Sequence, residues 1–426
     1  MYTSSFEELK KMAAMFVSQL LKADFKSATE QFDDQMGNLF NESKLQKQWE
    51  EVTKESGTFL QLTPTSSSEM ENYKIIIIKC QFQRFDMDVQ VVFNEQGLIS
   101  GLNFMPVYMI YNPPEYVDKS AFKEMDVTVG EGKWALPGTI TLPKGNCPFH
   151  GVVLVHGSGP NDRDETIGPN KTFRDLAWGL ASLGIAVLRY DKRTFKYSKQ
   201  FTPELISEMT VKEEVIDDAL LAIKQMRQND SVDSEKVFLL GHSLGATLAP
   251  RIGLRDPNLS GLIIMAGITR SLEDTILDQF TYIYGLSGTM TDQQKVELET
   301  LKNKVNKLKD PELSDNIPPK DLPFGVPIAY WRDLQENKPL DVVKKISMPI
   351  LILQGERDYQ VLATKDFEEG WKKALGGIKT VKFKLFPKLN HLFMSGENKS
   401  TPQDYNIEGH VDEDVINTIA EWVGKN

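Results

Sequence analysis

The sequence has few of the residues that bind metals or cross-link small proteins. Its 426 residues include two cysteines, Cys80 and Cys147, and five histidines, and none of them stands in an H-E-x-x-H or C-x-x-C spacing. Two cysteines are too few for a disulfide framework, and without clustered ligands no metal site is expected. We therefore expect an activity that needs neither a metal ion nor another cofactor.

Long apolar runs and an excess of positive charge are also missing. The densest apolar run, Ile75 to Ile78, lies between two lysines, whereas a membrane span needs about 20 apolar residues. The formal net charge of −11 argues against nucleic acid or anionic membranes as partners, because both bind clustered Lys and Arg. The chain opens on a charged amphipathic stretch and not on a leader, which favours a cytoplasmic protein. An exported protein whose leader has been removed is the alternative.

Length and composition predict a globular protein of more than one unit. The apolar content of 40% and the charged content of 26% are typical of globular chains, and 426 residues exceed one ordinary core. Over residues 1–107, helical periodicity is followed by strand-like alternation, which predicts a small α+β module. Helices are expected at 5–36 and 43–56, and strands at 59–62, 73–82, 86–93 and 98–104. The serine-rich run 63–68 is interpreted as a loop, and paired prolines indicate a linker over residues 108–120.

From residue 121 to 426, apolar runs of buried-strand type alternate with helical stretches. This β-α-β alternation predicts an α/β fold with a mostly parallel sheet and helices on both faces. The strands are expected at 151–155, 185–189, 237–240, 262–265, 350–353 and 381–386, after an edge hairpin of 125–129 and 138–142. Roughly eighty residues separate Met265 from Pro349, where one helix would suffice. We interpret 268–345 as a helical cap over the carboxyl ends of the strands, where such sheets bind ligands.

The motif with the most chemical content is Gly241-His-Ser-Leu-Gly245, between an expected strand and an expected helix. A G-x-S-x-G sequence in this setting is typical of a nucleophile elbow, which exposes the serine at the end of a sheet. A serine hydroxyl needs a general base, and the base needs an acid that orients it. Asp358 and His391 each follow the carboxyl end of an expected strand, at the edge where Ser243 should emerge. We predict a triad of Ser243, His391 as the base and Asp358 as the acid.

Two competitors remain for the partners of the serine. Glu356 lies two residues before Asp358, and His410 lies at the start of the last expected helix. The spacing after the strand favours Asp358 over Glu356. A capping or solvated role is expected for His410.

The oxyanion that forms during acyl transfer needs N–H groups already in place. The residue after the nucleophile, Leu244, is predicted to supply one of them. The glycine-rich turn His156-Gly-Ser-Gly-Pro160 is predicted to supply the other, through Ser158. His156 and Gly157, together with Tyr330 and Trp331 of the cap, are candidate substrate contacts, although packing is the alternative for the histidine and both aromatic residues. Packing is also expected for His242.

These residues together resemble the α/β-hydrolase superfamily. The runs 161–165 and 189–193 are similar to its bacterial branch near the dienelactone hydrolases, acyl-CoA thioesterases and prolyl-oligopeptidase-like domains. Residues 1–107 resemble the NTF2-like or cystatin-like module of unknown function that precedes some bacterial hydrolases. Two departures stand out: the nucleophile is serine where dienelactone hydrolases use cysteine, and no repeated β-propeller is present. The resemblance implies a serine hydrolase that cleaves carboxylic esters through an acyl-enzyme.

Several alternatives stay open on the sequence alone. The same triad would serve an acyl-CoA thioesterase, an acyltransferase or a small-peptide hydrolase, and a CoA substrate would favour a basic entrance for which Lys192, Arg193 and Lys196 are candidates. Arg163, Asp191 and Arg193 are expected to form a structural ion-pair group. The expected partner is a small-molecule ester or acyl substrate, and a homodimer is one alternative for the assembly. A non-catalytic binding protein is the competing class, mainly for residues 1–107.

Overall fold

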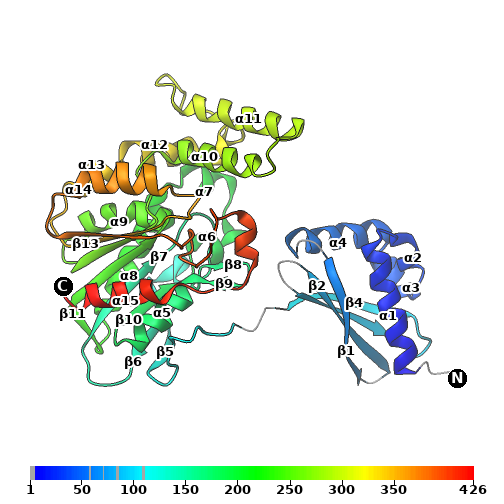
Figure 1. The fold of residues 1–426 in the computed structure, drawn as a ribbon. Coiled ribbons are helices and arrows are strands. Elements are labelled where there is room, and N and C mark those ends of the chain that lie inside the picture. Colours follow the sequence, from blue (N-terminus) through cyan, green and yellow to red (C-terminus); the bar gives the residue numbers. More distant parts are fainter. Residues whose placement is uncertain (1–4, 57–58, 71, 83–85, 108–110) are drawn as a thin grey trace. The chain divides into compact units, whose positions relative to one another are not determined.

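The computed structural model describes residues 5–56, 59–70, 72–82, 86–107 and 111–426. The chain divides into two compact units, an N-terminal unit that ends at Asn112 and a C-terminal unit that begins at Pro113. Figure 1 labels many of their helices and strands. Part of the predicted linker, residues 108–110, lies outside the described residues.

The N-terminal unit consists of four helices followed by an antiparallel sheet. The helices are α1 (Phe6–Leu21), α2 (Phe25–Thr29), α3 (Asp34–Leu39) and α4 (Glu42–Ser56). The strands are β1 (Phe59–Met70), β2 (Tyr73–Phe82), β3 (Asp86–Phe93) and β4 (Ile99–Val107), paired in chain order. Leu9 and Phe16 of α1 are buried in one core with Ile76 of β2 and Val89 of β3. The alternating pattern of the strands therefore gives the sheet one face that packs on the helices.

Two predictions for this unit are wrong. The expected helix 5–36 is interrupted after Leu21, because Ala23 adopts a left-handed φ of 58° and the Asp24 side chain caps a new helix. The expected loop 63–68 is part of β1 and pairs with β2, with a register irregularity between Pro64 and Ser66. The proline is accommodated because β1 is an edge strand, where a missing N–H is tolerated.

The C-terminal unit is built on an eight-stranded, mostly parallel sheet. Its order is β14-β13-β12-β11-β7-β10-β6-β5, and the antiparallel hairpin of β5 and β6 closes one end. The strands are β5 (Phe122–Val129), β6 (Leu136–Pro143), β7 (Phe149–Val155), β10 (Ala186–Tyr190), β11 (Val232–His242), β12 (Gly261–Met265), β13 (Ile350–Gly355) and β14 (Val381–Phe386). The predicted α/β fold class is confirmed.

Helices cover both faces of this sheet, because alternate residues of each buried strand point to opposite sides. Val153 and Val155 of β7 join a core with α8 (Asp217–Arg227) and α9 (Leu244–Arg255). Val152 and Leu154 join the opposite core with α5 (Thr172–Ser182) and α15 (Glu413–Val423). Shorter elements are β8 (Thr166–Ile167), β9 (Asn170–Lys171), α6 (Arg193–Lys196), α7 (Pro203–Glu208), the π-helical segments η3 (Lys212–Ile216) and η6 (Ala363–Lys372), and α14 (Lys373–Leu375).

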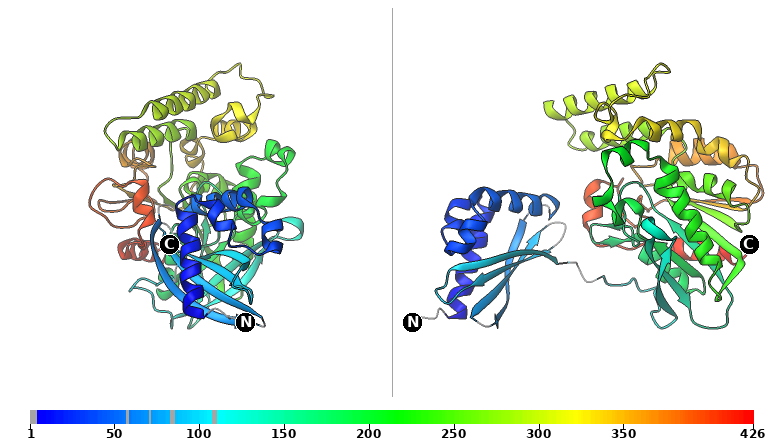
Figure 2. Two further views of the ribbon diagram at one scale, coloured as in Figure 1. Left: turned by 90° about the vertical axis from the view of Figure 1, so that its right-hand side faces the viewer. Right: turned by 180° about the vertical axis from the view of Figure 1, so that it is seen from behind.

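Four helices interrupt the alternation between β12 and β13. They are α10 (Leu272–Gly285), α11 (Asp292–Leu308), α12 (Ile328–Glu336) and α13 (Pro339–Val343). Leu308, Leu322, Ile328 and Trp331 form a small core within the cap, whereas Tyr330 of α12 and Val343 of α13 join the core on one face of the sheet. Of its helices, α11 lies farthest from the sheet in Figures 1 and 2. Among the described residues, no helix is both long and apolar enough to cross a membrane.

Candidate active site

Ser243 lies in a sharp turn between β11 and α9 that requires glycine at two of its positions. Its φ of 53° and ψ of −114° are strained for a residue with a side chain, as at functional sites where the surroundings force the geometry. A Cβ at Gly241 would lie 2.3 Å from the carbonyl oxygen of Gly245, and one at Gly245 would lie 2.2 Å from that of Val155. The two glycines of the motif are therefore required by the close approach of backbone to backbone.

Gly245→Ala should test this close approach. We expect the free energy of unfolding to fall by about 3 kcal/mol, the upper end of ordinary overpacking, because the clashing atom belongs to the backbone and cannot rotate away. Urea denaturation of both proteins measures the difference. Gly285→Ala is the matched control, since a Cβ there would meet nothing within 4 Å and its effect should stay within about 0.5 kcal/mol. Equal midpoints for Gly245→Ala and the wild type would contradict the packing argument.

The structure brings the predicted base and acid into direct contact. His391 Nδ1 lies 2.7 Å from Asp358 Oδ2, and both side chains are buried. The other carboxylate oxygen, Oδ1, accepts the backbone N–H groups of Gln360 at 2.7 Å and Val361 at 3.0 Å. Gln354 Nε2 donates to Oδ2 at 3.2 Å. Because every contact of the carboxylate is a donor, Asp358 can hold a proton on His391 Nδ1 and leave Nε2 free to accept one.

Ser243 and His391 line the same cavity of about 540 Å³. Gly157, Ser158, Tyr330 and Trp331 line it as well, so six of the predicted site residues meet there, drawn from the sheet and from the cap. The remaining lining is mostly apolar and includes Ile167, Ile206, Ile268, Leu272, Ile276, Phe324 and Val326. A cavity of this size and character suits a small, largely apolar molecule.

The turn after β7 packs directly against Ser243. A methyl group at Gly157 would lie 3.1 Å from Ser243 Cβ and 3.6 Å from its hydroxyl oxygen. The N–H of Gly157 is engaged by Glu165 Oε1 at 2.7 Å, so the next N–H, that of Ser158, is the better candidate from this turn. Leu244 opens α9, where the first N–H groups of a helix have no acceptor within it.

Glu165 is one residue of the site that sequence reasoning missed. It is 1% exposed, has a left-handed φ of 49°, and places Oε2 2.8 Å from His242 Nδ1. Burial alone would raise the pKa of Glu165, but His242 outweighs it and the pKa is lowered. Burial would likewise lower the pKa of His242, but Glu165 raises it. His242 Nε2 contacts the carbonyl oxygen of His391 at 2.9 Å, so Glu165 and His242 connect the turn after β7 to the loop of His391.

Other predicted residues take structural roles. His156 was a candidate substrate contact, but it is not among the described residues that line the cavity. Its ring is buried against Phe173 and Tyr190. Burial lowers its pKa to about 4, which keeps it neutral while Nε2 contacts the carbonyl oxygen of Asp162 at 3.0 Å. His410 Nδ1 lies 3.2 Å from Asp175 Oδ1, away from the triad.

One part of the predicted ion-pair group is wrong: Arg163 pairs with Asp191 as expected, but Arg193 does not belong to the group. Arg163 donates to both oxygens of Asp191, at 3.0 and 3.2 Å. Arg193 instead pairs with Asp218 of α8 through Nε at 3.0 Å and Nη2 at 2.5 Å. Asp191 and Arg193 are close in sequence, but the turn into α6 directs the guanidinium of Arg193 to another helix.

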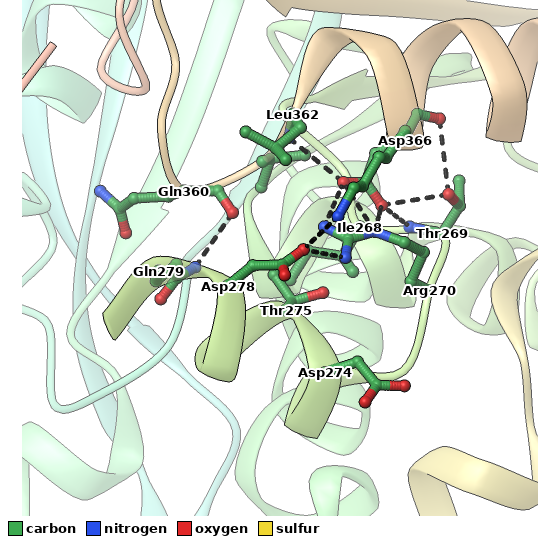
Figure 3. Close-up of polar contacts among 12 residues, drawn as sticks. Ile268, Thr269, Arg270, Asp274, Thr275, Asp278, Gln279, Gln360, Leu362 and Asp366 are labelled. Atoms are coloured by element: carbon green, nitrogen blue, oxygen red, sulfur yellow. Dashed lines mark hydrogen bonds and ion pairs between the residues drawn. The ribbon is translucent and has the colours of Figure 1, made fainter. Parts of the chain in front are cut away.

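The buried carboxylate of Asp366 binds both the start of the cap and the loop that follows Asp358. Figure 3 shows Asp366 of η6 accepting from the backbone and hydroxyl of Thr269 and from the guanidinium of Arg270, just before α10. The same carboxylate accepts the N–H of Leu362 at 3.2 Å, four residues after Asp358. The first residues of the cap and the loop that follows Asp358 thus both bind the carboxylate of Asp366.

Comparisons with known proteins identify the family of this chain. A model of the serine aminopeptidase S33 family matches residues 148–319, and a model of a protein of unknown function (DUF3887) matches residues 13–102. Esterase EstD of Thermotoga maritima is 40% identical over 414 residues, which cover 97% of this chain and 95% of that protein. The chain belongs to the esterase EstD family. The predicted serine hydrolase of the α/β-hydrolase superfamily, with an N-terminal module of unknown function, is thereby confirmed.

Two of the solved structures that match the chain have low sequence identity to it. Est1E from Butyrivibrio proteoclasticus is 15% identical, with a TM-score of 0.43 over 70% of this chain and 99% of that chain. The acylaminoacyl peptidase of Pyrococcus horikoshii is 12% identical, with a TM-score of 0.47 over 86% of this chain and 56% of that chain. Within the described residues, no group of three or more His, Cys, Asp or Glu side chains is arranged to hold a metal ion.

Proposed function

We propose that this member of the esterase EstD family hydrolyses carboxylic esters of small molecules through a triad of Ser243, His391 and Asp358. The observation that carries the proposal is the 2.7 Å contact of His391 Nδ1 with the buried carboxylate of Asp358. His391 also lines the same cavity as Ser243, whose backbone is strained. A base oriented by an acid beside an exposed serine is the arrangement that acyl transfer requires. The kinship with an esterase favours esters as the acyl donors.

In the first half of the reaction, Ser243 Oγ attacks the ester carbonyl while His391 Nε2 takes its proton. The carbonyl oxygen becomes an oxyanion, and the N–H groups of Leu244 and Ser158 stabilise it. The tetrahedral intermediate then collapses, the bond to the alcohol breaks, and His391 gives its proton to the leaving oxygen. The product of this half is an acyl-enzyme on Ser243.

In the second half, water takes the place of the alcohol. His391 Nε2 accepts a proton from water as the hydroxyl oxygen attacks the acyl carbonyl, and the same two N–H groups hold the second oxyanion. Collapse releases the carboxylic acid, and the proton returns to Ser243. Asp358 stabilises the imidazolium in both halves and stays ionised.

The charged groups near the cavity favour a simple ester over an acyl-CoA. Two of the three cations considered for a CoA entrance are engaged inside the protein: Lys192 is buried in an ion pair with Glu214, and Arg193 is paired with Asp218. Lys196 alone remains exposed. A nucleotide with several phosphates would favour more than one such charge.

A fluorophosphonate tests the assignment, because it reacts with activated serines and forms a stable adduct. We expect one equivalent to attach, and peptide mapping by mass spectrometry to place it on Ser243, with no label on the neighbouring Ser158. Loss of ester hydrolysis should track the labelled fraction. Full activity after labelling, or an adduct on another residue, would rule out the proposed nucleophile. A panel of p-nitrophenyl esters, acyl-CoAs and peptide amides of matched acyl length then identifies the acyl donor.

A further inference from the structure

Buried charged side chains hold Gly157 by both of its backbone groups. Its N–H donates to Glu165 Oε1 at 2.7 Å, and its carbonyl oxygen accepts from Lys192 Nζ at 2.9 Å. Asn161 Nδ2 also donates to this carbonyl, at 3.3 Å. Gly157 is buried beside Ser243, and a methyl group at Gly157 would touch that serine.

The carbonyl of Gly157 belongs to the same peptide unit as the N–H of Ser158. In a trans peptide the two groups point in opposite directions. An ammonium group that fixes the carbonyl on one side therefore fixes the direction of the N–H on the other, and Ser158 lines the cavity. A charged donor on the oxygen also polarises the peptide, which makes its N–H a stronger donor to a developing negative charge.

Lys192 is itself held firmly, although lysine side chains are flexible. The side chain is 3% exposed, and Nζ lies 2.8 Å from Glu214 Oε1. The second oxygen of Glu214 accepts from the hydroxyl of Tyr330 at 2.6 Å, and Tyr330 belongs to α12 of the cap. The backbone N–H of Lys192 donates to the carbonyl of Asn161 at 3.0 Å, within the same turn. A chain of contacts thus runs from the cap to the carbonyl of Gly157.

We propose that Lys192, anchored by Glu214 and Tyr330, is a positioning residue that orients and polarises the Gly157–Ser158 peptide for binding the oxyanion. The proposal rests on the proposed function, in which the N–H of Ser158 is one of the two oxyanion donors. It assigns to this buried ion pair a role in the transition state, and to the cap a part in completing the site.

The test is the double variant Lys192→Met/Glu214→Gln, which leaves no buried charge without its partner. Removing one oxyanion donor lowers kcat by about 10²–10³-fold. Lys192 only positions such a donor, so we expect kcat for a p-nitrophenyl ester to fall by about 10–100-fold with KM nearly unchanged. Circular dichroism and thermal unfolding establish that the variant is folded.

A pair of inhibitors separates positioning from a merely structural role. A trifluoromethyl ketone forms a tetrahedral serine adduct with an oxyanion, whereas the matching secondary alcohol occupies the cavity without one. The proposal predicts that the variant loses about 10–100-fold in affinity for the ketone, in parallel with kcat, and keeps its affinity for the alcohol. Equal losses for both inhibitors, or no loss for either, would overturn it.

Arg251→Met/Asp333→Asn is the matched control. Arg251 of α9 and Asp333 of α12 also form a largely buried ion pair between the cap and the rest of the unit, with Arg251 Nη2 2.8 Å from Asp333 Oδ1. This control should leave the ratio of the two inhibition constants at the wild-type value.

Fluorophosphonate labelling of the wild type at Ser243 separates the two hypotheses. If the labelling fails, the proposed function fails. If it succeeds while the ratio of inhibition constants is unchanged in Lys192→Met/Glu214→Gln, only the role of Lys192 fails.

Discussion

Ser243→Ala is expected to lower kcat for ester hydrolysis by about 10⁴–10⁶-fold, the range of losses when a triad nucleophile is removed. The oxyanion donors and the cavity remain in this variant, so some rate above the uncatalysed reaction should survive. Stability should change little, because the elbow is shaped by Gly241 and Gly245, and alanine has no hydroxyl that needs a partner. Steady-state kinetics and thermal unfolding on the same preparation measure both effects.

Ser260→Ala is the control for this loss. Ser260 directly precedes β12, its hydroxyl donates to the carbonyl of Glu235 in β11, and it is not among the described residues that line the cavity. Activity within twofold of the wild type is expected for it. A Ser243→Ala protein that turns over esters at a rate close to the wild type would refute the triad and every step built on it.

Asp358→Asn is expected to lower kcat by about 10³–10⁴-fold without unfolding the protein. Two backbone N–H groups, of Gln360 and Val361, donate to Oδ1 and require an oxygen there. The asparagine must then place its NH₂ group at the position of Oδ2, facing His391 Nδ1. A donor at that position makes Nδ1 the acceptor and puts the proton on Nε2, where it cannot accept the proton of Ser243.

The geometry of Asp358→Asn gives a second, structural consequence. The NH₂ group would also face the amide of Gln354, which donates to Oδ2 at 3.2 Å in the wild type. We therefore expect a modest loss of stability, about 1–3 kcal/mol, which is typical for a buried donor left without an acceptor. Chemical denaturation measures it.

Glu356→Gln serves as the control for the acid, because Glu356 was the competing candidate and its side chain is exposed. It should keep kcat within about twofold. If Glu356→Gln lost activity and Asp358→Asn kept it, the acid would have been misassigned.

How far the sequence predicts the structure depends on the range of the contacts involved. The strands of the C-terminal unit were predictable because burial on both faces requires continuous apolar runs, and the elbow was predictable because its geometry depends on a few adjacent residues. The N-terminal helix was predicted too long, since apolar periodicity continues past Leu21 while the left-handed Ala23 breaks it. Run 63–68 looked like a loop because serine and proline favour turns, yet pairing with β2 overrides that preference.

The sequence by itself determined the type of fold and the sharp turn at Ser243, and it predicted the chain order of the proposed serine, acid and base, because each depends on local periodicity or on where a strand ends. Only the tertiary structure decided that Glu165 and Lys192 hold the peptides beside the nucleophile and that Tyr330 reaches them through Glu214. Glu165 stands among the other acidic residues of 161–165, with no local signal that separates it from Asp162 or Asp164. Its role arises from burial and from partners nearly eighty residues away, and the contact of Tyr330 with Glu214 spans 116 residues.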